Sequence, residues 1–400
     1  MGRFSKPRLP FPNKTLRLSL LPRDILFEIL VRLGAKSRGK LCCVSKSFRS
    51  IITAPSFVEF HRNWSTAASH GTTILFSVRS QSVDSLTLPG SFQLEEFYTI
   101  NYKSLGQNQP GMGKLLEAKR VSWSRDLQYW CSAPDLICLY NRDGAVEIPN
   151  LCTGQHTTLP ATPTWSDFET ESCAHVGLDG SSAYKVLKSE SCFGLDKVKH
   201  WVLTLGVDAT WREIKAPDCH FRTSVCINGV TYFEDVIFRN RSRWKELFGG
   251  FPIVAFDVWS ETFHGVARPL GETEFDLVKS SFLELDGALA IICLRHNRLI
   301  TWSLDSASCW KKNVFPAPLD SASLFYCTIK TTPTGEILLV MPNERGTCSL
   351  WVLFDKFTCP VWKKFGIEGL GGFPNYNCEM IKAIKPIMVQ NVAENLFHLE

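Results

Sequence analysis

The sequence predicts an α+β chain in which a small all-α unit precedes a large all-β domain, most simply a β-propeller of kelch-like blades. Three observations predict this division. Apolar residues recur at helical spacing between residues 20 and 60, short β-rich runs separated by Gly, Pro, Asp and Asn fill the chain after residue 70, and similar runs return about every 50 residues. We expect a basic flexible N-terminal segment at 1–17, a helical domain at 18–62 and a β domain at 70–400.

Composition excludes several classes of protein. Of the 400 residues, 44% are hydrophobic and 21% are charged, which is typical of a globular protein. The formal charge of +5 is too small to indicate a nucleic-acid partner, and no apolar run of about 18 residues predicts a membrane span. Without a recognisable secretory signal, the 15 cysteines are expected to be reduced thiols of a cytoplasmic and/or nuclear protein. No C-x-x-C pair occurs, so we expect no metal site and no cofactor.

The helical unit is expected to contain two main helices. Over residues 22–33, offsets of 0, 1, 4, 5 and 8 place the apolar side chains on one stripe, formed by Ile25, Leu26, Ile29, Leu30 and Leu33. A second helix is expected from about residue 37 to 52, with a short further turn after Pro55. Because so small a unit buries little apolar surface, it is expected to lean on the β domain or on a partner.

The same stretch resembles an F-box. Residues 21–33 read LPRDILFEILVRL and residues 43–52 read CVSKSFRSII, which match the two conserved parts of that family's pattern; Gly39, inside the second helix, departs from it. The resemblance implies docking on the Skp-family adaptor of a cullin–RING ubiquitin ligase, with helices packed against helices. The residues that it assigns to this interface or its support are Leu21, Pro22, Ile25, Leu26, Ile29, Leu30, Val44 and Phe48.

The β region is built from repeats in which an apolar strand, a polar turn and a second strand follow one another. An aromatic or Thr residue follows the turn in each copy, at Thr157, Trp211, Phe263, Trp310 and Trp362, with spacings of 54, 52, 47 and 52 residues. This period is typical of propeller blades. Hairpin turns are expected at 228–229 (NG), 286–287 (DG) and 334–335 (TG). The ring at each repeat is expected to pack between blades, because a blade exposes apolar faces that only its neighbours cover.

Residues 130–310 resemble the F-box-associated domain of the large plant F-box family. The resemblance is carried by residues 149–160, 177–187 (GLDGSSAYKVL), 211–214 (WREI), 226–232 (CINGVTY) and 254–257 (VAFD). It implies that the β domain selects a target protein. Blade number stays open, because residues 60–130 and 365–400 follow the repeat poorly.

Motifs of catalysis are missing or incomplete. Residues 303–310 (SLDSASCW) resemble a sialidase-type Asp box, which is itself a turn between propeller strands, and no phosphate loop, nucleophile elbow or H-E-x-x-H motif occurs. No catalytic residue is therefore assigned. The basic segment with Arg239, Arg241 and Arg243 is a weak candidate for substrate binding, as a loop that receives an acidic part of the target.

These observations favour a non-catalytic substrate-recognition subunit of an SCF-type (cullin–RING) E3 ubiquitin ligase, which binds the adaptor through the F-box and an unidentified target through the β domain. Ubiquitination would then depend on proximity rather than on a catalytic group of this chain. Two alternatives remain, an adaptor-bound scaffold that does not promote degradation and a propeller-fold glycosidase-like enzyme.

Overall fold

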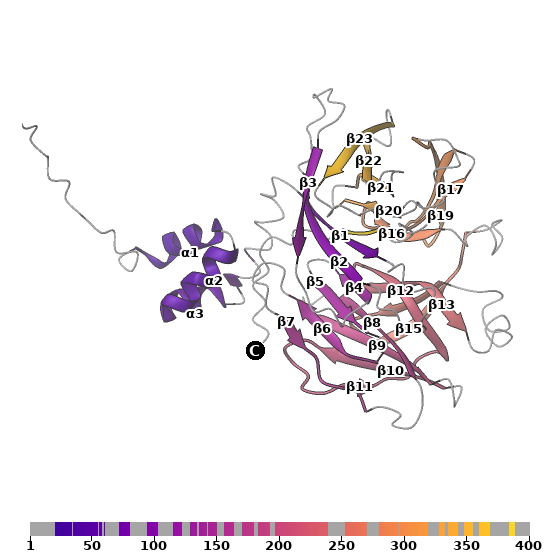
Figure 1. The fold of residues 1–400 in the computed structure, drawn as a ribbon. Helices are drawn as coiled ribbons and strands as arrows, with labels where there is room; N and C mark the ends of the chain where they lie inside the picture. Colours follow the sequence, from indigo (N-terminus) through magenta and orange to yellow (C-terminus); the bar gives the residue numbers. More distant parts are fainter. Residues whose placement is uncertain are drawn as a thin grey trace, which may run out of the picture.

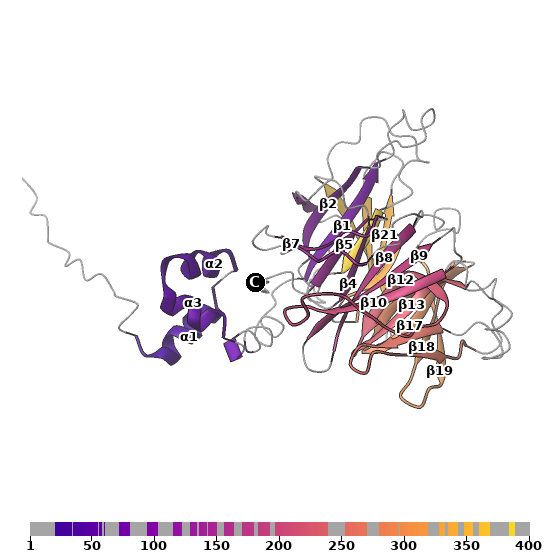
Figure 2. The ribbon, with the colours of Figure 1, turned by 90° about the horizontal axis from the view of Figure 1, so that it is seen from below.

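Three short helices precede a five-bladed β-propeller in the computed structural model (Figure 1). The structure describes residues 21–60 and 72–388 with gaps, the longest of which are 61–71, 81–93, 103–114, 239–252, 270–279, 319–327 and 369–383. The helices stand apart from the sheets in two perpendicular views (Figures 1 and 2). The predicted succession of an all-α unit and a large all-β propeller is therefore confirmed.

The helical unit contains α1 (Arg23–Val31), α2 (Ala35–Val44) and α3 (Lys46–Ile52). The expected single helix over residues 37–52 is wrong, because the chain breaks at Ser45. The backbone of Ser45 is extended, and its hydroxyl accepts a hydrogen bond from the Phe48 N–H, with a donor–acceptor distance of 3.4 Å. This serine therefore caps the start of α3 instead of continuing α2.

A small apolar core holds the three helices together. It is formed by Leu30, Val31, Ile51, Ile52 and Phe57, with Phe27, Leu33, Leu41 and Phe48 packed around it. Every member lies between residues 27 and 57. The helical unit therefore has a core of its own.

Four of the five sheets are four-stranded antiparallel meanders in which strands follow chain order. The first sheet contains β4 (Tyr129–Ala133), β5 (Leu136–Tyr140), β6 (Val146–Pro149) and β7 (His156–Thr158), and the second contains β8 (Thr170–Leu178), β9 (Tyr184–Cys192), β10 (Lys197–Thr204) and β11 (Arg212–Glu213). The third contains β12 (Cys219–Ile227), β13 (Val230–Phe238), β14 (Ile253–Asp257) and β15 (Thr262–Val266), and the fourth contains β16 (Ser281–Leu285), β17 (Ala288–Arg295), β18 (Arg298–Leu304) and β19 (Trp310–Pro316).

The fifth sheet joins the two ends of the β region. Its eight strands are β20 (Thr328–Thr331), β21 (Ile337–Pro342), β22 (Cys348–Phe354), β23 (Val361–Glu368), β3 (Leu115–Val121), β2 (Leu94–Tyr102), β1 (Thr72–Ser80) and β24 (Ile384–Met388), in that order. Strand β23 pairs with β3 in parallel, and β24 returns to pair with β1. These pairings close the ring. They also explain why the two ends of the region did not follow the repeat.

Apolar cores fill the spaces between neighbouring sheets, and one tryptophan bond recurs there. The indole Nε1 of Trp211, Trp310 and Trp362 donates to the main-chain oxygen of Pro160, Ala267 and Pro316, at 2.5, 2.8 and 2.7 Å respectively. Each acceptor lies at the end of the last strand of the preceding sheet or one or two residues after it. The repeated aromatic position therefore links one blade to the next, as the sequence predicted.

Two of the predicted hairpin turns have the required backbone. Both residues of each turn have positive φ, 48° and 80° at Asn228 and Gly229 and 54° and 76° at Asp286 and Gly287. Positive φ at both central positions is typical of the two-residue type I′ hairpin turn, whose twist matches that of the strands it joins. At the third turn Gly335 has φ 82°, and Thr334 lies outside the described residues.

Candidate functional site

The structure divides the eight residues assigned to the helical interface by their exposure. Leu26 and Leu30 are buried among the helices, and Leu21, Ile29 and Phe48 are half-buried. Pro22, Ile25 and Val44 are exposed, Ile25 with 48% and Val44 with 75% of the residue's surface accessible. An exposed aliphatic side chain on a short helix is available to a partner, whereas Leu26 and Leu30 support the unit from within.

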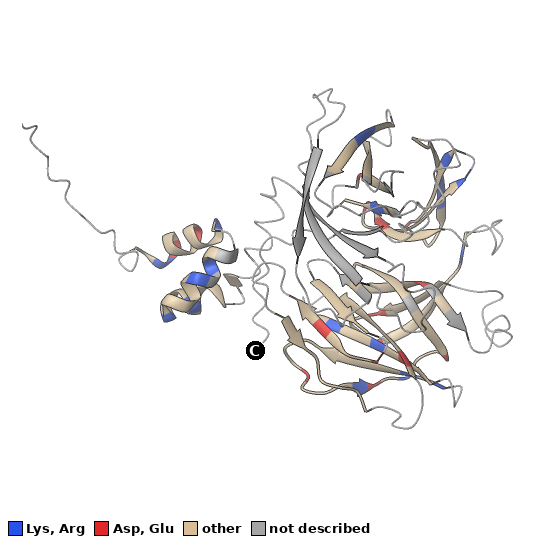
Figure 3. Cartoon of the chain, viewed as in Figure 1, with Lys and Arg blue, Asp and Glu red and all other residues tan. Residues whose placement is uncertain are grey.

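Sequence reasoning missed one exposed aromatic of this unit. Phe60 is 43% exposed, and its ring lies edge-on to that of Phe27 at a centroid distance of 5.4 Å. Lys and Arg residues are frequent on the same helices (Figure 3), and residues 21–60 carry seven Lys or Arg, of which Arg38 is buried, against three Asp or Glu. The helical unit therefore combines exposed apolar side chains with a net positive charge.

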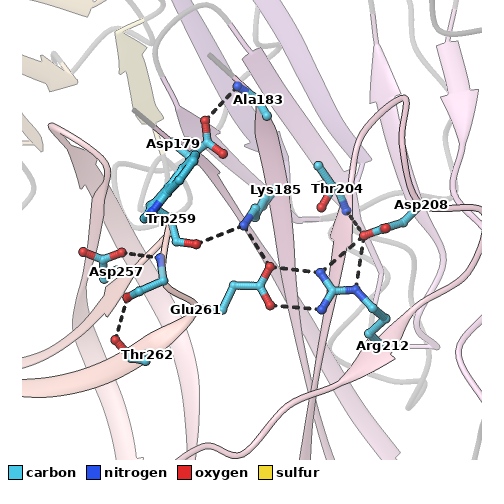
Figure 4. A network of polar contacts seen from close by, with 11 residues as sticks. Asp179, Ala183, Lys185, Thr204, Asp208, Arg212, Asp257, Trp259, Glu261 and Thr262 are labelled. Atoms are coloured by element: carbon cyan, nitrogen blue, oxygen red, sulfur yellow. Dashed lines mark hydrogen bonds and ion pairs between the residues drawn. The ribbon is translucent and has the colours of Figure 1, made fainter. Parts of the chain in front are cut away.

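A polar network ties together three hairpin tips on two neighbouring sheets (Figure 4). The guanidinium of Arg212 donates to both carboxylate oxygens of Glu261, at 2.9 and 3.1 Å, and its Nε lies 3.4 Å from Oδ2 of Asp208. Lys185 Nζ donates to Glu261 Oε1 at 2.8 Å and to the main-chain oxygen of Trp259 at 3.3 Å. Hydrogen bonds from Arg212 hold the pKa of Glu261 below its ordinary value. The network therefore fixes the β10–β11 and β14–β15 tips to each other.

The family-like sequence elements meet at this place. In the GLDG element, a Cβ on Gly177 would lie 2.6 Å from Cγ2 of Val258, so only glycine lets the two blades approach so closely. Asp179 accepts a hydrogen bond from the Ala183 N–H at 2.9 Å and closes the β8–β9 turn. Tyr184 and Trp211 are buried in the core shared by the β4–β7 and β8–β11 sheets.

Buried titratable groups lie in the same sheets. Burial lowers the pKa of His175 to about 3 and that of His200 to about 4, so both imidazoles are neutral at physiological pH. His175 Nδ1 lies 2.8 Å from Ser224 Oγ, and His200 Nδ1 lies 2.9 Å from Ser189 Oγ. Both rings pack against phenylalanines. These contacts indicate a structural role for both histidines.

The Asp box resemblance proves to be a turn. Asp305 accepts hydrogen bonds from the N–H groups of Ala307 and Cys309, at 3.0 and 2.9 Å, and Ser308 has φ 59° between β18 and β19. The carboxylate therefore stabilises the hairpin between β18 and β19.

The candidate substrate-binding segment with Arg239, Arg241 and Arg243 falls outside the described residues. Within the described ranges, no group of three or more His, Cys, Asp or Glu side chains is placed to hold a metal ion. Among the same residues, no helix has the length and apolar character needed to cross a membrane.

Comparisons with known proteins agree with the two-part fold. A family model described as an F-box domain matches residues 18–60, and one described as an F-box associated beta propeller domain matches residues 92–372. F-box protein At5g65850 of Arabidopsis thaliana is 30% identical over 393 residues, which cover 91% of this chain and 89% of that protein. Putative F-box protein At4g38870 of the same plant is 28% identical over 338 residues, covering 79% and 73%. F-box protein At1g47340, also of Arabidopsis thaliana, is 30% identical over 271 residues. These cover 63% of this chain and 54%, about half, of that protein.

Proposed function

Because this chain belongs to the plant F-box proteins with a C-terminal F-box-associated β-propeller domain, we propose that it is the substrate-recognition subunit of an SCF-type (cullin–RING) E3 ubiquitin ligase. The helices α1–α3 bind a Skp-family adaptor, and the propeller binds a target protein. F-box proteins are typically non-catalytic, and in this proposal the chain contributes proximity between target and ubiquitin-charged enzyme. Its place of action is the cytoplasm, the nucleus or both.

One observation supports adaptor binding most directly. The helical unit fills its core with its own side chains and still exposes Ile25 and Val44. Isolated side chains of this kind cost little in a monomer, but they are the anchors that a helix-binding groove accepts. The net positive charge of the helical unit is expected to raise the rate of association with an acidic partner and to make that rate salt-dependent.

The first test changes these two exposed anchors. Replacing Ile25 and Val44 together by aspartate is expected to weaken adaptor binding by about a hundredfold, because two desolvated anchors are each worth about 1–2 kcal/mol or more. Titration of the purified full chain with a purified Skp-type adaptor measures the effect. Folding should be retained, because neither side chain belongs to the helical core.

A matched control is available in the β domain. Val361 in β23 is 47% exposed, so Val361→Asp introduces the same carboxylate on a comparable surface outside the helices. This variant is expected to bind the adaptor as the unchanged protein does. Equal adaptor binding by the double helical variant, with its helices still folded, would reject the docking assignment.

A further inference from the structure

Two exposed apolar side chains lie at neighbouring hairpin tips. Trp259, in the β14–β15 turn, is 66% exposed, and Val207, in the β10–β11 turn, is 76% exposed. The turn that carries Trp259 makes its core contact through the neighbouring Val258, which is buried. An exposed tryptophan at a turn leaves a large apolar ring in contact with water, and covering that ring favours association with another protein.

The turn that carries Trp259 is held rigidly. The Ser260 N–H donates to Asp257 Oδ1 at 2.7 Å, the Val258 N–H donates to the Gly229 oxygen at 2.9 Å, and Lys185 binds the Trp259 oxygen. A partner that binds such a turn therefore has little backbone to order. Tryptophan is among the residues most enriched at the energetic centres of protein interfaces.

The neighbouring turn is fixed in a similar way. Asp208 Oδ2 accepts a hydrogen bond from the Thr204 N–H at 2.8 Å, and Gly206 has φ 74°, which the tight β10–β11 turn requires. Arg212 then joins Asp208 to Glu261 across the two sheets. Val207 and Trp259 are therefore presented by two tips that one guanidinium holds together.

The charge around these tips is opposite to that of the whole chain. The carboxylates of Asp208, Asp257 and Glu261 lie at these tips against the two cations of Lys185 and Arg212 (Figure 4), whereas Asp179 is buried. The full chain carries a net charge of +5. A local excess of negative charge beside an exposed indole complements a basic partner, because the indole face also attracts Lys and Arg.

We propose that the hairpin-tip patch, with Trp259 and Val207 as anchors, binds a short segment of the target protein that carries an apolar side chain flanked by Lys or Arg. This inference rests on the proposed function, because it assigns the target-binding surface of the substrate-recognition subunit. It places this surface on the described hairpin tips rather than on the Arg239–Arg243 segment, which would require an acidic target.

A defined peptide assay tests the patch. A displayed random-peptide library is selected against the purified full chain, and the enriched peptides are titrated against the unchanged protein and three variants, Trp259→Ala, Val207→Ser and Val314→Ser. We expect enriched peptides to combine an apolar residue with Lys or Arg. Trp259→Ala should raise their Kd about tenfold or more and Val207→Ser about threefold, as for central and lesser contacts of an interface.

Val314→Ser is the matched control, because Val314 is 47% exposed on β19, away from these tips; its Kd should stay unchanged. Enriched peptides that are acidic, or binding that is indifferent to Trp259→Ala, would overturn the inference. So would self-association through Trp259, seen as a dimer that only Trp259→Ala removes in sedimentation velocity. Adaptor titration of the same variants separates the two claims. If the proteins bind the adaptor but peptide binding does not depend on Trp259, only the hairpin-tip patch is refuted. If the proteins do not bind the adaptor but peptide binding does depend on Trp259, only the ligase role is refuted.

Discussion

Replacing Lys188 by methionine is expected to lower the free energy of unfolding by about 3–5 kcal/mol, because it leaves the Glu190 carboxylate buried without its counter-ion. Lys188 Nζ lies 2.8 Å from Glu190 Oε1, and both side chains are only 2% exposed. Thr162 donates to the same carboxylate and accepts from Lys188 at 2.7 Å. Burial lowers the pKa of Lys188, which shows the cost of holding its charge between two sheets. Urea denaturation followed by tryptophan fluorescence measures the loss.

Two further variants make this result specific. The double change Lys188→Met with Glu190→Leu removes both charges and is expected to recover most of the stability, because an apolar pair of similar volume replaces a buried ion pair at little cost. Lys199→Met breaks an exposed pair with Glu213, whose charged atoms lie 3.6 Å apart, and should cost less than about 1 kcal/mol. If Lys188→Met cost no more than Lys199→Met, the buried pair would not exist in solution.

Replacing Trp211 by alanine is expected to destabilise the propeller by about 3–5 kcal/mol, the usual cost of deleting a buried aromatic ring. Trp211 is 6% exposed and packs in the core between the β4–β7 and β8–β11 sheets. Its loss also leaves the Pro160 oxygen without the Nε1 donor. Thermal and urea denaturation of the full chain measure both effects together.

Trp211→Phe separates packing from hydrogen bonding. It keeps most of the ring and loses only the donor, so a cost of about 1–3 kcal/mol is expected. Trp259→Ala is the matched control, and it should change stability by less than about 0.5 kcal/mol, since that ring is exposed. Equal stability losses for Trp211→Ala and Trp259→Ala would contradict the inter-blade role of the repeated tryptophan. Because Lys188 Nζ lies 5.9 Å from the Trp211 ring, changes at the two positions are not expected to add.

Local signals in the sequence predicted most of the local structure. The helical stripe of α1 and the Asn228-Gly229 and Asp286-Gly287 turns depend on neighbours a few residues apart, and the recurring aromatic residue was visible as a repeat of about 50 residues. The break at Ser45 was missed, because apolar spacing continues across it and only the hydroxyl's bond to the Phe48 N–H distinguishes a cap from a helix interior. The available signal was Ser45 itself, a residue type favoured at helix N-caps.

Non-local pairing was beyond the sequence. Nothing in residues 384–388 shows that they pair with β1 near the other end of the domain, or that β23 runs parallel to β3. For the same reason the sequence did not indicate the buried Lys188–Glu190 pair, which exists because both faces of β9 are covered by neighbouring sheets. The hairpin-tip patch was also invisible, since Trp259 and Arg212 are brought together only by the packing of two blades.

In the proposed function the helices bind the adaptor and the propeller does not, and hydrogen–deuterium exchange with and without the Skp-type adaptor tests this division most directly. On saturation of the full chain with adaptor, slower exchange is expected across Arg23–Ile52, with exchange in β4–β19 unchanged. Protection centred on the sheets, or helices that exchange as quickly with the adaptor as without it, would contradict this division.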